Sequence, residues 1–380
     1  MKVPANSEIL KWARTTSNLS LDDVASRIGR PREVVEAWEN GQDAPTYAQL
    51  EALAYGIYKR PLAVFFFPEP PQEEGLKESF RTIPGVEFDR IPPRILQLIR
   101  QAKSTQIGLS ELCDGHNPSD NRILERLIVK EPSEPVQVAQ NVRRFLNISL
   151  QEQASWSEAA QAAERWRSAI EAAGVFIFKD AFRQDEISGF CLYDRDFPVI
   201  LVNNSMPITR QIFTFFHELG HLMFETSGID RTDQSPSSLS GQSDRVEVFC
   251  NELAAEVLVP TADFVARLHR RPYSDQSVFA LAARYSVSRE VILRRFLDMG
   301  LVSNDYYRRK AEEWIAEARR SRRGTSGGNY YATKIAYLGK TYLNIAFAQY
   351  YRNRLSIHEL SGYLGVKVDH ITALEQAFSR

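Results

Sequence analysis

The sequence predicts a multidomain protein that is mainly α-helical and contains one small β-sheet. Three observations lead to this fold class. The chain has 380 residues, enough for two or three domains. Capped helical patterns fill most of it, whereas short β-rich runs lie between residues 175 and 203. Breaks rich in proline or glycine divide it into four parts: helices at 1–68, a linker and helical connection at 69–150, an α+β part at 151–300 and a helical tail at 301–380.

An ordinary globular composition excludes several classes of protein. Apolar residues make up 43% and the formal net charge is −1, so overall charge identifies no partner. Cys113, Cys191 and Cys250 are widely spaced and odd in number, which argues against a disulfide framework and fits a reducing compartment. The first ten residues lack the apolar core of a signal peptide, and no run approaches the roughly 18 apolar residues that span a membrane. We therefore expect a cytoplasmic protein with no membrane partner.

Residues 1–68 have the pattern of a small helical bundle. Ser20 followed by Asp23 indicates a helix N-terminus, and Gly29 ends this helix before Pro31 starts the next one. The second helix ends near Gly41, and its apolar side chains pack it against the first. Two short helices joined by a glycine turn are the pattern of a helix-turn-helix.

The segment LSLDDVASRIGRPREVVEAWENGQDAPTYAQLEALA resembles the XRE-type (phage repressor-like) helix-turn-helix, including its Trp-Glu-x-Gly ending. The resemblance implies DNA binding, with Arg30 and Arg32 as candidate contacts. An alternative is a protein-docking or dimerisation module, since residues 1–68 hold eight basic and eight acidic side chains. Three glutamates lie on the helix that would enter the DNA groove: Glu33, Glu36 and Glu39.

Residues 69–150 form the connection to the next part. The run PEPPQEEG is proline-rich and acidic, which predicts an extended linker. A helical pattern follows from about Pro93 to Leu112, and the break EPSEP at 131–135 precedes a further helix. No residues here have catalytic spacing, so we expect this connection to support and position the next domain.

Residues 151–300 combine a helix with a small sheet. The helix around Ser157–Ala173 ends at Gly174. Three apolar runs follow and predict strands: VFIF at 175–178, GFCLY at 189–193 and VILVN at 199–203. These predicted strands come directly before the next helical stretch.

The next stretch, IFTFFHELGHLMFE at Ile212–Glu225, carries the strongest motif. If it is helical, His217 and His221 project from one face, one turn apart, as two imidazoles must to share a metal ion. Glu218 can then reach a water on that metal. This is the HExxH arrangement of zinc metallopeptidases, in which the metal lowers the pKa of water and the glutamate takes its proton. A helix, a sheet and then this helix are the order expected of a zincin. The alternative is a buried helix with two satisfied histidines.

A tetrahedral catalytic site needs a third protein ligand. Acidic residues follow at Glu225, Asp230, Asp233, Asp244, Glu247, Glu252 and Glu256. Asp230 and Asp233 lie in a Ser-rich segment that predicts a loop, a poor support for a ligand. The apolar residues from Val246 to Leu258 have helical periodicity, which puts Glu247 and Asn251 one turn apart at the edge of a buried face. Spacing favours Glu247 and leaves the others open.

The two segments RQIFTFFHELGHLMF and EVFCNELAAEVLVP together resemble the ImmA/IrrE family of metallo-endopeptidases, whose second motif reads E-x-x-A-N-x-F-A-x-x-L-x-x-P. The alignment matches the family's Glu, Asn and closing Pro with Glu247, Asn251 and Pro260, while Cys250 replaces an Ala and Leu253 a Phe. The resemblance implies a Zn²⁺ site formed by His217, His221 and Glu247, with Glu218 as general base. Asn251 is either a partner that orients a ligand or a helix-packing amide.

A peptidase also needs a donor for the oxyanion of its intermediate. The candidates are Arg210, Arg245, His269 and Tyr285, and the sequence does not choose among them. Residues 275–300 are similar in outline to another helix-turn-helix, which we interpret as packing for the helices of the site.

Residues 301–380 form a basic helical tail with thirteen basic and seven acidic side chains, an excess of six. A charged helix at Tyr306–Arg320 leads into the linker RRSRRGTSGG, and amphipathic helices follow, one of them opening with the Ser-capped LSIHELSGYLGV. The tail resembles the C-terminal extension of many XRE-plus-ImmA/IrrE proteins. It is either a surface for nucleic acid or an acidic partner, or a solvated linker and packing module.

Together these features predict a zinc endopeptidase with a DNA-binding-like domain that cleaves a regulatory protein. The resemblance suggests an XRE-type repressor or a toxin–antitoxin partner as substrate. The main alternative is a non-catalytic helix-turn-helix regulator or antitoxin whose zinc is structural or sensory. A third interpretation is an interaction protein without metal.

Overall fold

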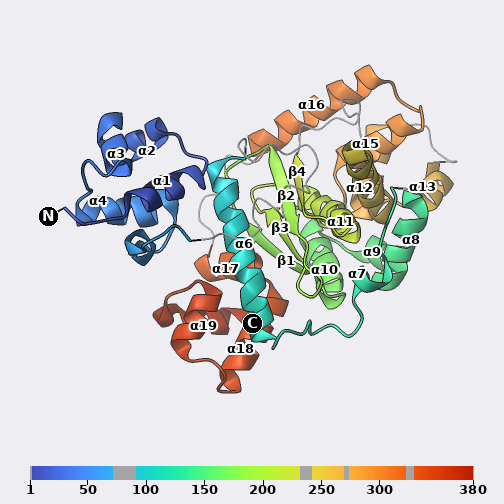
Figure 1. Ribbon diagram of the computed structural model, residues 1–380. Helices are drawn as coiled ribbons and strands as arrows, with labels where there is room; N and C mark the ends of the chain where they lie inside the picture. The colour runs from blue at the N-terminus through green and yellow to red at the C-terminus, as the bar shows by residue number, and fades with distance from the viewer. Residues whose placement is uncertain are drawn as a thin grey trace. The chain divides into compact units, whose positions relative to one another are not determined.

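The computed structural model describes residues 2–71, 91–132, 134–231, 242–268, 274–321 and 329–379. It is mainly helical, with one four-stranded mixed sheet and a helical C-terminal region, so the predicted fold class is confirmed (Figure 1). The chain divides into two compact units, Met1–Gln101 and Ala102–Arg380. Within the described ranges, no helix is both long and apolar enough to cross a membrane.

The first unit is built from short helices around one core. In chain order they are α1 (Ser7–Thr15), α2 (Leu21–Ile28), α3 (Arg32–Glu39), α4 (Tyr47–Glu51), the π-helical η1 (Ala52–Tyr58) and the 3₁₀ helix η2 (Leu62–Phe66). Val24, Val35 and Trp38 bring α2 and α3 into this core, together with Leu50 and Tyr58. Burial of this apolar face stabilises helices that are each too short to persist alone in water.

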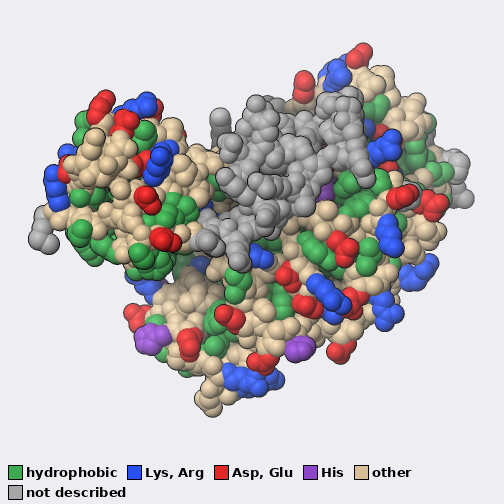
Figure 2. Space-filling view, in the orientation of Figure 1, with side chains coloured by type: hydrophobic (Ala, Val, Ile, Leu, Met, Phe, Trp, Pro, Cys, Tyr) green, Lys and Arg blue, Asp and Glu red, His purple; other side chains and the backbone are tan. Residues whose placement is uncertain are grey.

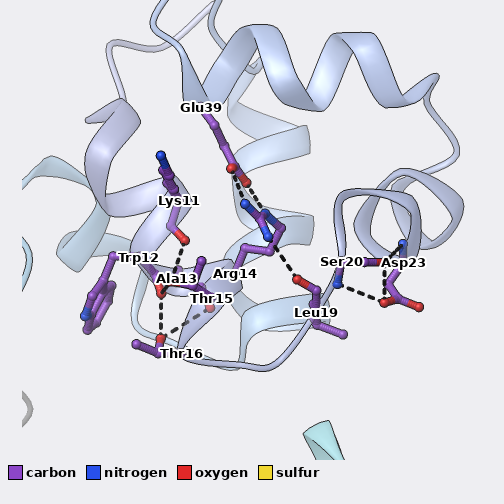
Figure 3. Close-up of polar contacts among 10 residues, drawn as sticks. All are labelled: Lys11, Trp12, Ala13, Arg14, Thr15, Thr16, Leu19, Ser20, Asp23 and Glu39. Carbon is purple, nitrogen blue, oxygen red and sulfur yellow. Dashed lines mark hydrogen bonds and ion pairs between the residues drawn. The ribbon is translucent and has the colours of Figure 1, made fainter. Parts of the chain in front are cut away.

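The turn between α2 and α3 follows from its capping residues. The Ser20 hydroxyl accepts from the backbone N–H of Asp23, whose carboxylate accepts in return from the N–H of Ser20 (Figure 3). Gly29 ends α2 with a φ of 65°, a left-handed conformation that costs glycine little. Pro31 then precedes α3.

The charge on Glu39 is neutralised inside the first unit. Arg14 on α1 donates to both carboxylate oxygens of Glu39, at 2.8 and 2.9 Å, and to the carbonyl of Leu19 (Figure 3). Glu39 is therefore buried against α1. Of the three glutamates on the helix that would enter the DNA groove, Glu39 therefore faces α1, because its partner Arg14 lies on another helix, which helical position alone does not reveal.

The second unit is organised around the sheet β1 (Phe176–Asp180), β2 (Ile187–Leu192), β3 (Val199–Asn203) and β4 (Gly228–Arg231). The strand order is β1-β3-β2-β4; β1 and β3 are parallel and the other pairs antiparallel. The three runs predicted as strands form β1 to β3. The segment around Asp230 was expected to be a loop, which is wrong: it forms edge strand β4, whose short, charged sequence is not strand-like and pairs because β2 is beside it.

The two faces of the sheet meet different helices. Ile177, Cys191 and Ile200 face a core shared with α10 (Ala159–Ala172) and α11 (Ile208–Met223). On the other face, Phe178 of β1 makes an edge-to-face contact with Tyr342. Gln106 of α6 (Pro93–Leu112) donates to the carbonyls of residues 192 and 197, and Figure 1 shows this helix alongside the sheet. Burial on both faces explains why the strands read as continuous apolar runs.

The remaining helices, in chain order, are α7 (Ile123–Arg126), α8 (Pro135–Leu146), α9 (Leu150–Ser155), α12 (Gln242–Leu258), α13 (Thr261–Leu268), α14 (Asp275–Tyr285), α15 (Arg289–Asp298), α16 (Asn304–Ser321), α17 (Tyr330–Leu338), α18 (Lys340–Tyr351), α19 (Ile357–Leu364), the 3₁₀ helix η6 (Val368–His370) and α20 (Ile371–Phe378).

The C-terminal end of α12 is held by two buried polar side chains. Arg143 of α8 donates to the carbonyl of Val257 at 2.7 Å and to the side chain of Gln153. Gln153 of α9 donates to the carbonyls of Leu258 and Tyr285, each at 2.9 Å. These bonds satisfy helix-end carbonyls that would otherwise be buried without partners. They fix the helix that carries Glu247.

Candidate metal centre

Helix α11 is the most deeply buried element of the second unit. It begins after Pro207, and every residue from Gln211 to Met223 is buried between the sheet, α10 and α12. His217, Glu218 and His221 are 1%, 0% and 2% exposed. Polar residues this deep in an apolar helix need partners or a ligand.

His217, His221 and Glu247 converge on one point. The Nε2 atoms of the two histidines are 3.2 Å apart. Glu247 of α12 places Oε2 3.4 Å from His217 Nε2 and Oε1 3.2 Å from His221 Nε2. Within the described residues this cluster has three donor atoms that could hold one metal ion.

The spacing of these atoms fits Zn²⁺. Ligand bonds of about 2.0–2.2 Å at tetrahedral angles put two donor atoms about 3.3–3.6 Å apart. The three separations of 3.2–3.4 Å in the structure are close to this range. Two imidazoles and one carboxylate are also a known donor set of catalytic zinc, which leaves its fourth position to water or substrate.

Asn251 orients the first histidine. Its Oδ1 lies 3.2 Å from His217 Nδ1. An amide oxygen only accepts, so Nδ1 carries the ring proton and Nε2 presents its lone pair to the cluster. Glu247 and Asn251 lie one turn apart on α12, and both therefore face α11.

The carboxyl group of Glu218 is buried without a well-oriented hydrogen bond. Neither oxygen has such a partner in the described part of the chain, although the thiol of Cys191, a weak donor, lies beside it. Burial raises the pKa of Glu218 to about 7, against the lowering influence of His221 and His217. A carboxyl group left unpaired at this depth costs stability, which marks it as a functional candidate.

The carboxylate of Glu247 and the protonated forms of the two histidines stabilise one another. Burial alone would raise the pKa of the Glu247 carboxyl, but His221 and His217 hold it well below its usual range. Burial would likewise lower the pKa of His221, yet Cys250 and Glu247 raise it well above its usual value. Protons and a metal ion would therefore compete for the same three side chains.

Asp230, another acidic candidate ligand, pairs with Arg210. Arg210 donates to both of its carboxylate oxygens, at 3.0 and 2.9 Å, and Thr214 donates to one of them at 3.2 Å. Asp230 is thus committed to a buried ion pair, and the Arg210 guanidinium is committed with it. Their pairing was missed because β4 was not recognised as a strand.

The other acidic candidates and oxyanion donors are spread over the unit. Glu225 accepts from Tyr193, Glu256 accepts from Thr261 and Arg295, and Tyr285 donates to Asp263. Arg245 and Glu252 are exposed on α12. Asp233, His269 and the side chain of Asp244 lie outside the described residues.

Two glycines allow α11 to approach its neighbours. A Cβ at Gly228 on β4 would lie 2.7 Å from the Cδ2 and Cγ atoms of His221, and one at Gly220 would lie 2.8 Å from the Cys250 sulfur. Both are shorter than any van der Waals contact. Glycine at 228 therefore sets the position of the His221 ring, a role that no sequence motif indicated.

Gly228→Ala is expected to displace the His221 ring and to lower zinc affinity by about 10- to 100-fold, the usual effect of disturbing a ligand's support. Affinity can be measured by competition with a chelating dye. Gly56→Ala is the matched control, because a Cβ there meets nothing within 4 Å. Equal affinity in both variants would contradict this role for Gly228.

Arg30 and Arg32, the candidate DNA contacts, are exposed around the turn between α2 and α3. Arg32 forms an ion pair with Asp22 at 3.1 Å. On the face shown in Figure 2, basic and acidic side chains are interspersed over this unit. The surface of the first unit is thus mixed in charge rather than uniformly basic.

Part of the second unit matches a known protein family. Residues 170–297 match the Peptidase_M78 family, described as an IrrE N-terminal-like domain. The match covers about a third of the chain and includes β1 to β4, α11 and α12, hence the three residues of the cluster and the buried Glu218. No curated protein matches the chain. The family match supports the resemblance to the ImmA/IrrE family and a metallopeptidase-like function for this part of the chain.

Proposed function

We propose that the protein is a zinc-dependent endopeptidase that cleaves a regulatory protein. The observation that carries the proposal is the triangle of donor atoms from His217, His221 and Glu247, with the buried Glu218 next to His217 on the same helix. The alternative of a purely structural zinc site explains the three ligands but gives no reason for a fourth, unpaired carboxyl group.

Zn²⁺, when bound, would supply a Lewis acid that polarises a peptide carbonyl and lowers the pKa of a water. Glu218 takes a proton from the attacking water as the C–O bond forms. It then passes that proton to the peptide nitrogen as the C–N bond breaks, which releases a carboxyl group and an amine. A pKa of about 7 suits a group that must both accept and donate near neutral pH.

The free edge of the sheet supports the proposal that the substrate is a polypeptide. β4 pairs with β2 on one side only, and among the described residues no strand pairs with its other edge. Gly228 of β4 lies against His221, so this edge runs beside the cluster. An extended peptide can add to such an edge through backbone hydrogen bonds and present its carbonyl to the site.

The resemblance of the sequence supports one class of substrate. We propose an XRE-type repressor or a toxin–antitoxin partner, cleaved in the cytoplasm, with the first unit acting as a helix-turn-helix that binds DNA. The proposal for DNA rests on the capped turn between α2 and α3 and on the exposure of Arg30 and Arg32.

Substituting Arg30 and Arg32 together with alanine is expected to weaken binding of the protein to its own operon DNA. Each lost ion pair with a phosphate should reduce the slope of log affinity against log salt by about 1, so the double substitution should reduce it by about 2. A mobility-shift titration at several salt concentrations measures this. Unchanged affinity and slope would remove both arginines from the DNA interface.

The proposed function is tested by comparing newly formed protein N-termini in cells that express the wild type or Glu218→Gln. We expect a peptide bond that is cut only by the wild type, which would identify the substrate as well. If no new terminus depends on Glu218 while both proteins hold equal zinc, the non-catalytic regulator becomes the better interpretation.

A further inference from the structure

The C-terminal helices repeat the construction of α2 and α3. The sequence LSLDDVASRIGRPREVVEAWE at 19–39 aligns without a gap with LSIHELSGYLGVKVDHITALE at 355–375. Every residue in the second segment lies 336 positions after its counterpart, as Ser356 does after Ser20. Helices α2 and α19 have eight residues each and begin and end at corresponding positions.

The caps of the two segments match in geometry. Ser356 and Glu359 form the same reciprocal pair of cap hydrogen bonds as Ser20 and Asp23. Gly365 ends α19 with a φ of 60°, close to the 65° of Gly29 at the end of α2. Equal spacing between a serine cap and a left-handed glycine fixes the same turn in both places.

The buried positions match as well. Val24, Val35 and Trp38 in the first segment correspond to Leu360, Ile371 and Leu374, and all six are buried. In both segments, the helix before the segment bonds to the end of its last helix. Arg14 of α1 donates to Glu39, and Tyr351 of α18 donates to the corresponding Glu375. The two segments thus share the capped turn, the buried positions and the side-chain bond that holds the last helix.

We propose that α19 and α20 form a second helix-turn-helix, and that the exposed face of its last helix binds double-stranded DNA. The turn before α20 carries Lys367 and Asp369, and α20 itself carries Thr372 and Gln376; all four are exposed, at positions that correspond to exposed residues of the first unit. This surface is independent of the proposed zinc site.

Side-chain chemistry favours nucleic acid as the occupant. Thr372 stands where the first unit has Glu36, so one of the two exposed carboxylates on the helix is replaced by a hydroxyl group. Gln376 offers an amide that can bond bidentately to adenine, and Lys367 can contact phosphate. Asp369 is the one carboxylate left on this exposed face and opposes phosphate, as Glu33 does at the corresponding place.

Most carboxylates of the second segment are engaged within the protein. Residues 355–375 have one basic and three acidic side chains, and the aligned residues 19–39 have three and five, so both segments have the same net charge of −2. Glu359 is used as a cap, and Glu375 accepts from Tyr351. Glu359 and Glu375 are thus held by partners within the protein, so Asp369 is the one carboxylate of this segment that opposes phosphate on the exposed face.

The test measures binding of the full-length protein to a fluorescein-labelled duplex pool of random sequence by anisotropy, across a series of salt concentrations. Lys367→Glu combined with Gln376→Glu is expected to weaken binding at least tenfold at low salt and to flatten the salt slope. Lys130→Glu combined with Gln140→Glu is the matched control, since both residues are exposed, lie on other elements and change the charge equally. This control should change the affinity for DNA less than threefold. Melting temperatures check that both variants fold.

Two results would overturn the proposal. One is an equal loss of affinity in the two variants, which would reflect net charge rather than a surface. The other is unchanged DNA binding by the Lys367/Gln376 variant; if its sedimentation shows altered self-association, the surface belongs to a protein contact. Zinc content and cleavage report separately on the proposed peptidase, so failure of one proposal does not affect the other.

Discussion

Glu218→Gln is expected to abolish peptide cleavage while zinc content stays unchanged. Glutamine has nearly the same shape, and Glu218 makes no well-oriented hydrogen bond that the substitution would break in the described structure. The amide cannot accept a proton from water, so the cleavage rate should fall by about 10²- to 10⁴-fold or more. Mass spectrometry of the cleaved substrate and metal analysis of the purified proteins measure both quantities.

Glu225→Gln is the control for this variant. Glu225 lies two residues beyond the end of α11 and accepts from the Tyr193 hydroxyl at the surface. The Glu225→Gln variant should keep the wild-type cleavage rate. Cleavage retained in Glu218→Gln would remove Glu218 from proton transfer. Regulatory activity that survives Glu218→Gln but fails in His217→Ala would favour a zinc-dependent regulator without turnover.

Glu247→Gln is expected to lower zinc affinity by about 100-fold or more. It removes the only negative charge among the three donors, and a neutral amide is a weaker ligand for a divalent cation. Zinc at 100 times its dissociation constant stabilises the wild type by about 2.7 kcal/mol, so a chelator should lower its melting temperature. The variant should show little shift on addition of zinc.

Glu252→Gln tests whether any carboxylate of α12 has this effect. Glu252 is on the same helix as Glu247 but is exposed. The zinc affinity of Glu252→Gln, and the shift in its melting temperature on addition of zinc, should equal those of the wild type. If Glu247→Gln binds zinc as tightly as Glu252→Gln does, a different carboxylate completes the ligand set.

Local sequence was sufficient for the features that depend on neighbouring residues. A one-turn spacing puts His217 and His221 on one face of any helix, whatever surrounds it. Ser20, Asp23 and Gly29 define the turn after α2 through bonds within a few residues. The apolar runs of β1 to β3 indicated buried strands for the same reason.

Tertiary structure decided which distant groups meet. Periodicity placed Glu247 at the edge of a buried face, but the packing of α12 on α11 brings its carboxylate to the two imidazoles. The strand β4 exists because β2 offers it an edge, and this pairing puts Asp230 beside Arg210 and Gly228 beside His221. Glu39 lies on the helix that would enter the DNA groove, but it is buried and paired with Arg14 of another helix. A sequence pattern shows which side of an element is apolar; the partner on that side depends on how the whole chain packs.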